Sequence, residues 1–70
     1  MKKIFVVFVI EENEKYYAFA DTIKTGENLI YHCNRYAAKL CHLCESRKEA
    51  DTLAITWNNQ YFNNGTYLFQ

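Results

Sequence analysis

The chain has 70 residues, half of them apolar and 17% aromatic, with no proline and only two glycines. This length fits one domain, residues 1–70, and the composition excludes a disordered or collagen-like chain. Eight Lys and Arg balance eight Asp and Glu, so the chain as a whole has no net charge to attract nucleic acid or anionic lipid.

The first predicted element is a strand at residues 3–10, where nearly every residue is β-branched or aromatic. Both faces of this strand are apolar, and such strands are normally covered on both sides. The two faces are Phe5, Val7 and Val9, and Ile4, Val6, Phe8 and Ile10. The apolar run is too short to span a bilayer, and acidic residues follow it directly, so we expect neither export nor a membrane anchor.

A second strand is predicted at residues 15–24, joined to the first as an antiparallel hairpin by the polar turn at residues 11–14. Gly26 suits the next turn because glycine adopts positive φ easily. Residues 29–37 fit either a short helix or an irregular loop. Residues 38–45 alternate loosely and favour a third strand.

The clearest helix signal is Ser46 with Glu49 three residues later, the pattern of a capping box. A helix is therefore predicted at residues 47–63, with Gly65 as its C-terminal cap. Its expected buried stripe is Ala50, Leu53, Ala54, Trp57 and Tyr61. Residues 66–69 form a short tail that suits a fourth edge strand.

These elements predict a small α+β domain: an antiparallel sheet of the N-terminal hairpin and a third strand, with the C-terminal helix packed on one face. One helix covers only one face, so we expect a two-fold homodimer to cover the other. Two alternatives stay open, namely that residues 29–37 cross this face or that a different protein binds it.

Three cysteines, Cys33, Cys41 and Cys44, are an odd number and predict reduced thiols in a cytoplasm. With His32 or His42 they are the one cluster that suits zinc. Residues three apart on a strand face opposite ways, however, so we expect Cys41 and Cys44 to diverge. Redox chemistry is disfavoured because the helix begins after both cysteines. We expect no metal and no cofactor.

No catalytic constellation is recognisable, and we predict that the domain is not an enzyme. Neither histidine has a carboxylate neighbour at a useful spacing, and Ser46 is explained as a helix cap. Two glycines also cannot build a phosphate-binding loop.

A candidate partner-binding surface lies in the C-terminal third, because residues 52–70 carry no charged side chain but many aromatic residues and asparagines. Interface cores are depleted of charge in this way. The alternative is that the tail folds back over this side of the helix. The residues predicted to contact a partner protein are Ile55, Asn58, Asn59, Phe62, Tyr67 and Phe69.

A less favoured alternative is a nucleic-acid-binding patch within residues 35–48, with aromatic side chains nearby for stacking. Its basic residues are Arg35, Lys39, Arg47 and Lys48. Nearby acidic residues and the neutral net charge weigh against it.

Residues 38–69 also carry an ordered series of short motifs: Ser-Arg-Lys-Glu-Ala at 46–50, Trp57-Asn58, Tyr61 and Asn-Gly-Thr-Tyr at 64–67. This series resembles small uncharacterised proteins of gut Firmicutes and of their phages and other mobile elements. The resemblance implies no activity or catalytic residue. It implies a setting in which small accessory proteins bind host or phage proteins, as anti-CRISPR inhibitors of host defence do.

Overall fold

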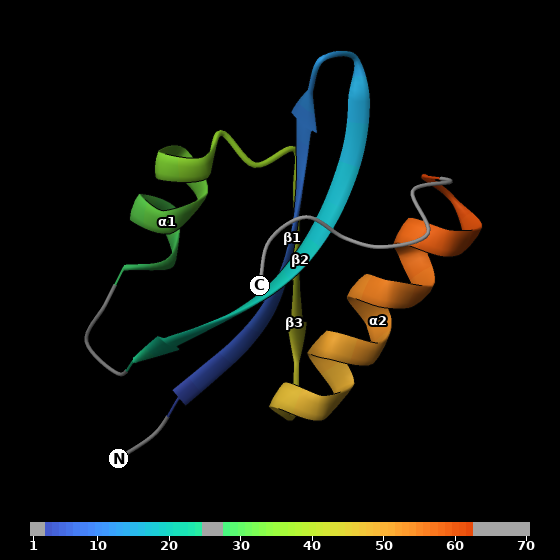
Figure 1. Cartoon of the computed structure of the whole chain (residues 1–70). Helices are drawn as coiled ribbons and strands as arrows, with labels where there is room; N and C mark the ends of the chain where they lie inside the picture. The colour runs from blue at the N-terminus through green and yellow to red at the C-terminus, as the bar shows by residue number, and fades with distance from the viewer. Residues whose placement is uncertain (1–2, 25–27, 63–70) are drawn as a thin grey trace.

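The computed structural model describes residues 3–24 and 28–62, which form a three-stranded antiparallel sheet between two helices (Figure 1). The sheet has the strand order β2-β1-β3. The elements are β1 (Lys3–Glu12), β2 (Lys15–Lys24), α1 (Leu29–Tyr36), β3 (Leu40–Cys44) and α2 (Arg47–Gln60). The predicted small α+β fold, with a hairpin, a third strand and a C-terminal helix, is confirmed.

The hairpin of β1 and β2 closes through a two-residue turn, Asn13 and Glu14, whose φ angles are 54° and 67°. Positive φ at both central residues defines the turn that matches the twist of paired strands. The pairing runs from Glu12 opposite Lys15 to Lys3 opposite Lys24. Predicted strand 2 matches β2, whereas β1 extends two residues beyond the predicted end because the turn is tighter than expected.

One face of the sheet packs against α2. Val7, Val9 and Ala18 on the strands meet Ala50 and Ala54, and all five side chains are buried. Alanines at this contact let the helix lie close to the strands, while larger residues flank it. Those flanking residues are Phe5, Ala20, Cys44, Leu53, Trp57 and Phe62, which are partly buried.

The predicted burial of Tyr61 is wrong, because its side chain is 71% exposed. The helix ends at Gln60, three residues before the predicted end, so Tyr61 is its C-terminal cap. At its start α2 follows the prediction: the Glu49 N–H donates to the Ser46 hydroxyl at 3.1 Å. The Glu49 carboxylate reaches back one residue further than a capping box requires and accepts from the Glu45 N–H at 2.7 Å.

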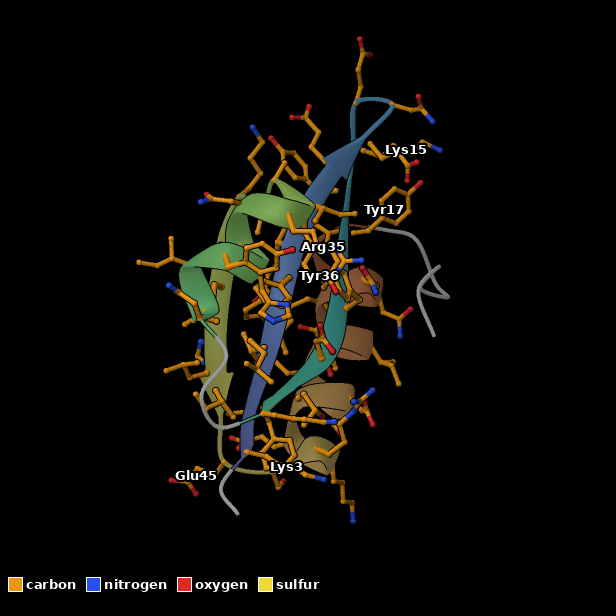
Figure 2. All side chains as sticks on the ribbon, turned by 90° about the vertical axis from the view of Figure 1, so that its left-hand side faces the viewer. Lys3, Lys15, Tyr17, Arg35, Tyr36 and Glu45 are labelled. Atoms are coloured by element: carbon orange, nitrogen blue, oxygen red, sulfur yellow. The ribbon has the colours of Figure 1, made fainter. Side chains whose placement is uncertain are left out.

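The other face of the sheet packs against α1, which Figure 2 shows in front of the strands with α2 behind them. Tyr36 of α1 stands over Phe8 and Phe19, with ring centroids 5.2 and 5.1 Å away, and its hydroxyl donates to the Asp21 carboxylate at 3.1 Å. Leu29 and Cys33 pack against the same buried cluster.

Residues 29–36 are therefore helical, and they cover the second face of the sheet from within the chain. This corrects the expectation that a second copy covers it, in favour of the alternative that residues 29–37 do. A helix of eight residues forms here because Asn28 caps its start, accepting from the Ile30 N–H at 2.8 Å. Ala37 closes its end in the left-handed region, with φ 53°.

The third strand is shorter than predicted, Leu40–Cys44 rather than residues 38–45. The Lys39 N–H donates to the Val9 carbonyl at 2.7 Å, which ties the chain to β1 just before β3 begins. The predictions for Gly26, Gly65 and the strand at residues 66–69 fall outside the described residues.

Candidate functional site

The solvent-facing side of α2 carries an uncharged row of side chains. Thr52, Ile55, Thr56 and Asn59 recur at the three- and four-residue spacing that places side chains together on a helix, and we call them the outer stripe. Ile55 is 48% exposed, and only Thr56 of the four is half-buried. Ile55 also has the charged Asp51 four residues before it, and an exposed isoleucine among polar side chains is a suitable contact for another protein.

An open groove of about 390 Å³ adjoins the outer stripe and shares Thr52 and Thr56 with it. Leu53 gives the groove an apolar component, and Lys48 with Glu49 place one charge of each sign at its N-terminal end. Ser46 completes the lining. The groove and the outer stripe together form a surface whose middle is uncharged, with Leu53 and Ile55 among threonines, and whose N-terminal end is charged. Protein interfaces commonly have charged residues at their rim in this way.

Asn58 does not belong to this surface, which corrects the prediction that it contacts a partner. Its side chain is fully buried. The side-chain carbonyl accepts from the Ala18 N–H at 2.8 Å, and the side-chain NH₂ donates to the Ala18 carbonyl at 2.9 Å. Asn58 is therefore a structural link between α2 and β2, and it is not available to bind a partner.

Of the other residues predicted to bind a partner, Ile55 and Asn59 lie on the outer stripe and are exposed. Phe62 is half-buried and stands against Tyr16 of β2, with ring centroids 5.9 Å apart. Only part of the Phe62 ring is therefore accessible to a partner protein. Tyr67 and Phe69 lie outside the described residues.

The four basic residues of the alternative nucleic-acid patch do not share one surface. Arg35 lies on α1, in front of the sheet in Figure 2, whereas Arg47 and Lys48 begin α2 behind it. Arg47 donates to Asp51 at 3.1 Å and to the Thr22 hydroxyl at 3.0 Å, and Lys39 pairs with Glu11 at 3.9 Å. The four residues therefore do not gather into one basic patch, because the sheet separates Arg35 from Arg47 and Lys48.

The three cysteines are free thiols, and the two that lie in contact are not the two that are closest in the sequence. Cys41 packs on the α1 side of the sheet and Cys44 on the α2 side, which confirms that the two diverge. Cys41 instead meets Cys33 of α1. Burial, and then the neighbouring Cys33 thiol, raise the pKa of Cys41 to about 11. Burial and then Glu49 also raise the pKa of Cys44. Neither thiol is therefore activated as a nucleophile.

Within residues 3–24 and 28–62, no three His, Cys, Asp or Glu side chains lie close enough together to hold a metal ion. In the same ranges, neither helix is long and apolar enough to cross a bilayer.

No protein-family model, curated protein or solved structure matches this chain. The resemblance to small proteins of gut Firmicutes and their mobile elements therefore stays a prediction.

Two features of the structure were missed from the sequence: the Asn58 link to β2 and the Cys33–Cys41 contact. Forty residues separate Asn58 from Ala18, and nothing in the local pattern relates them. A weak signal existed for Asn58, because it continues the spacing of Ala50 and Ala54 by four residues. The Cys33–Cys41 contact required knowledge that residues 29–36 form a helix over the sheet.

Proposed function

We propose that this domain is a non-enzymatic protein-binding module whose binding surface is the outer stripe of α2 with the adjoining groove. The observation that carries the proposal is the position of Ile55, which is 48% exposed on a row of uncharged side chains, with Thr52 before it and Asn59 after it. A partner that covers Ile55 gains apolar burial.

The partner we propose is a host-defence protein, which the domain inhibits by occupying its surface, as anti-CRISPR proteins do. The resemblance of residues 38–69 to small proteins of phages and mobile elements supports this setting. It also supports action of the domain in the bacterial cytoplasm, where the thiols stay reduced.

Affinity capture tests the binding surface. Immobilised wild-type chain, Ile55→Lys and Asn34→Lys are each incubated with lysate of a gut Firmicute that carries an active CRISPR system. Asn34 is exposed on α1, on the other side of the sheet, so its variant adds the same charge away from the proposed site. We expect one stoichiometric partner on the wild type and on Asn34→Lys, and its loss on Ile55→Lys.

Salt dependence separates this proposal from binding to nucleic acid. Contacts to phosphates weaken steeply between about 50 and 500 mM salt, whereas an uncharged protein interface does not. We expect the captured partner to remain bound at the higher salt and after nuclease treatment. The same captured proteins on all three chains, or a complex that nuclease dissolves, would contradict the proposal.

Inhibition has its own readout. The chain is expressed in a host whose CRISPR system targets a phage, and plating of that phage is counted. We expect the wild type and Asn34→Lys to restore plating and Ile55→Lys to leave it suppressed. Binding without restored plating would retain the binding surface and refute the inhibitory role.

A further inference from the structure

The hydrogen bonds of Ala18 fix which backbone groups point out of the sheet. Ala18 lies opposite Val9 on β1, yet its N–H and carbonyl both bond to Asn58. In an antiparallel ladder, consecutive residues point their backbone groups alternately to one neighbouring strand and the other. Val9 therefore bonds toward β3, consistent with its carbonyl accepting from Lys39.

The same alternation applies to β3. Leu40, His42 and Cys44 lie opposite Val9, Val7 and Phe5, whose backbone groups point toward β3. These three residues therefore bond to β1, and the N–H and carbonyl groups of Cys41 and Leu43 point away from the sheet. β3 is an edge strand, so these groups form its open edge.

Among the described residues, side chains occupy part of the opposite edge of the sheet but none of this one. On β2, Asn58 occupies both outward groups of Ala18, and the Asp21 carboxylate accepts from the Thr22 N–H at 2.8 Å. On the β3 side, the Glu49 carboxylate accepts a hydrogen bond from the N–H of Glu45, the residue after the strand. Within residues 3–24 and 28–62, no group bonds to the outward N–H and carbonyl groups of Cys41 or Leu43.

The open edge of β3 is therefore short and symmetric about His42. Lys39 bonds inward to β1 before it, and Glu49 closes it after Cys44. Two copies of such an edge are complementary in antiparallel orientation. With His42 opposite His42 of the second copy, Cys41 faces Leu43 of that copy, and each such pair exchanges both N–H···O=C bonds.

We propose that this chain forms a two-fold homodimer in which β3 pairs with β3 of a second copy, making one continuous six-stranded sheet. The side chains favour it. Leu40 and Leu43 are 49% and 57% exposed on opposite faces of β3, and pairing places each against a cysteine of the other copy. β3 carries no charged side chain, although charges are what commonly keep edge strands apart.

A mass measurement tests the dimer. Sedimentation equilibrium is run from about 10 µM to about 1 mM, the range that reveals a weak dimer. We expect the mass to approach twice the 8.3 kDa of one chain. Leu43→Lys places like charges near one another across the two-fold axis, and we expect it to remain at the mass of one chain. Ile55→Lys adds the same charge on α2, outside the edge, and should still dimerise.

These variants separate this proposal from the proposed function. We expect Leu43→Lys to lose the dimer but still capture the host partner. We expect Ile55→Lys to keep the dimer but lose the host partner. Together these results would show that the two surfaces are independent. Wild-type chain that stays at one-chain mass throughout the concentration range overturns the dimer and leaves the partner surface standing.

Disulfide trapping tests the register and does not depend on the folding of Leu43→Lys. The three native cysteines are replaced by serine, and His42→Cys or Leu40→Cys is added. Opposed residues at the two-fold axis have Cα atoms about 4.5 Å apart, within disulfide range, whereas the two copies of residue 40 are about 13 Å apart. With oxidised glutathione we expect a cross-linked dimer for His42→Cys alone. Equal cross-linking of both variants, or of neither, overturns the register.

Discussion

Asn58 is a polar side chain that is fully buried between α2 and β2. Its side-chain amide bonds to both the N–H and the carbonyl of Ala18, as the backbone of a neighbouring strand would do at this edge of β2. A buried amide is tolerated because its carbonyl and its NH₂ are both paired. The same bonds occupy backbone groups that would otherwise be open to edge-to-edge pairing.

We therefore predict that Asn58→Ala destabilises the domain by about 2 to 4 kcal/mol, because two backbone groups of Ala18 lose their partners in a buried site. Urea unfolding followed by circular dichroism measures the change. Asn59→Ala is the matched control, since Asn59 is the neighbouring asparagine and is exposed. It should change stability by no more than about 0.5 kcal/mol. Equal effects of the two substitutions would contradict the role assigned to Asn58.

The pKa of the Cys41 thiol gives a second prediction. Burial and then the neighbouring Cys33 raise this pKa from 9.0 to about 11. A raised pKa means that the folded state holds the proton more tightly than the unfolded state does. The resulting contribution to stability is complete below pH 9.0 and disappears as the pH rises toward about 11.

The free energy of unfolding should accordingly fall between about pH 9 and pH 11, and Cys41→Ser should flatten that fall. Burial also raises the pKa values of Tyr36 and Cys44, so part of the slope should remain. Cys44→Ser is the control, with a smaller effect on the slope expected. Comparing slopes rather than absolute stabilities removes the packing change that each substitution causes. An unchanged slope in Cys41→Ser would refute this assignment.

Among the elements, α1 is the least determined by its own sequence. Its eight residues are fewer than an isolated helix needs in water, so it depends on its caps and on packing against the sheet. Its inward residues Leu29, Cys33 and Tyr36 follow a helical spacing, yet that pattern over so few residues fits a loop equally well. The sequence therefore left helix and loop open, and packing on Phe8 and Phe19 selects the helix.

We predict that Ala37→Gly stabilises the domain by about 1 kcal/mol, because Ala37 sits at φ 53°, where an L-residue with a Cβ atom is strained and glycine is not. Thermal unfolding measures the gain as a higher melting temperature. Ala38→Gly, one residue later and outside the positive-φ set, should be neutral or destabilising. A lower melting temperature for Ala37→Gly would show that the αL conformation costs this chain nothing.

The other elements were largely predictable because their signals are local. The hairpin follows from two β-branched and aromatic runs around a short polar turn, and the start of α2 follows from Ser46 and Glu49. The end of α2 was placed too late because Gly65 was taken as its C-terminal cap and Tyr61 as part of its buried stripe, whereas the helix ends at Gln60. A glycine several residues beyond a helix is therefore an unreliable marker of where the helix ends.

At the scale of the whole molecule, the sheet is covered on one face by each helix (Figure 1). Partners are therefore expected at outer surfaces and not at a bare face of the sheet. The composition predicted an uncharged C-terminal surface, and Ile55 and Asn59 are exposed there. It could not separate Asn58 from Asn59, because these two neighbouring asparagines differ only in the direction that the fold gives their side chains. The residues of the predicted basic patch likewise straddle the sheet.

Site-specific photocrosslinking tests the binding surface most directly. A benzophenone amino acid replaces Ile55 on the outer stripe, or Asn34 on α1, and the chain is expressed in the CRISPR-active host before irradiation. We predict a covalent adduct with one host-defence protein from position 55 and none from position 34. Adducts with that protein from position 34, or only background adducts from position 55, would contradict the claim that α2 carries the partner-binding surface.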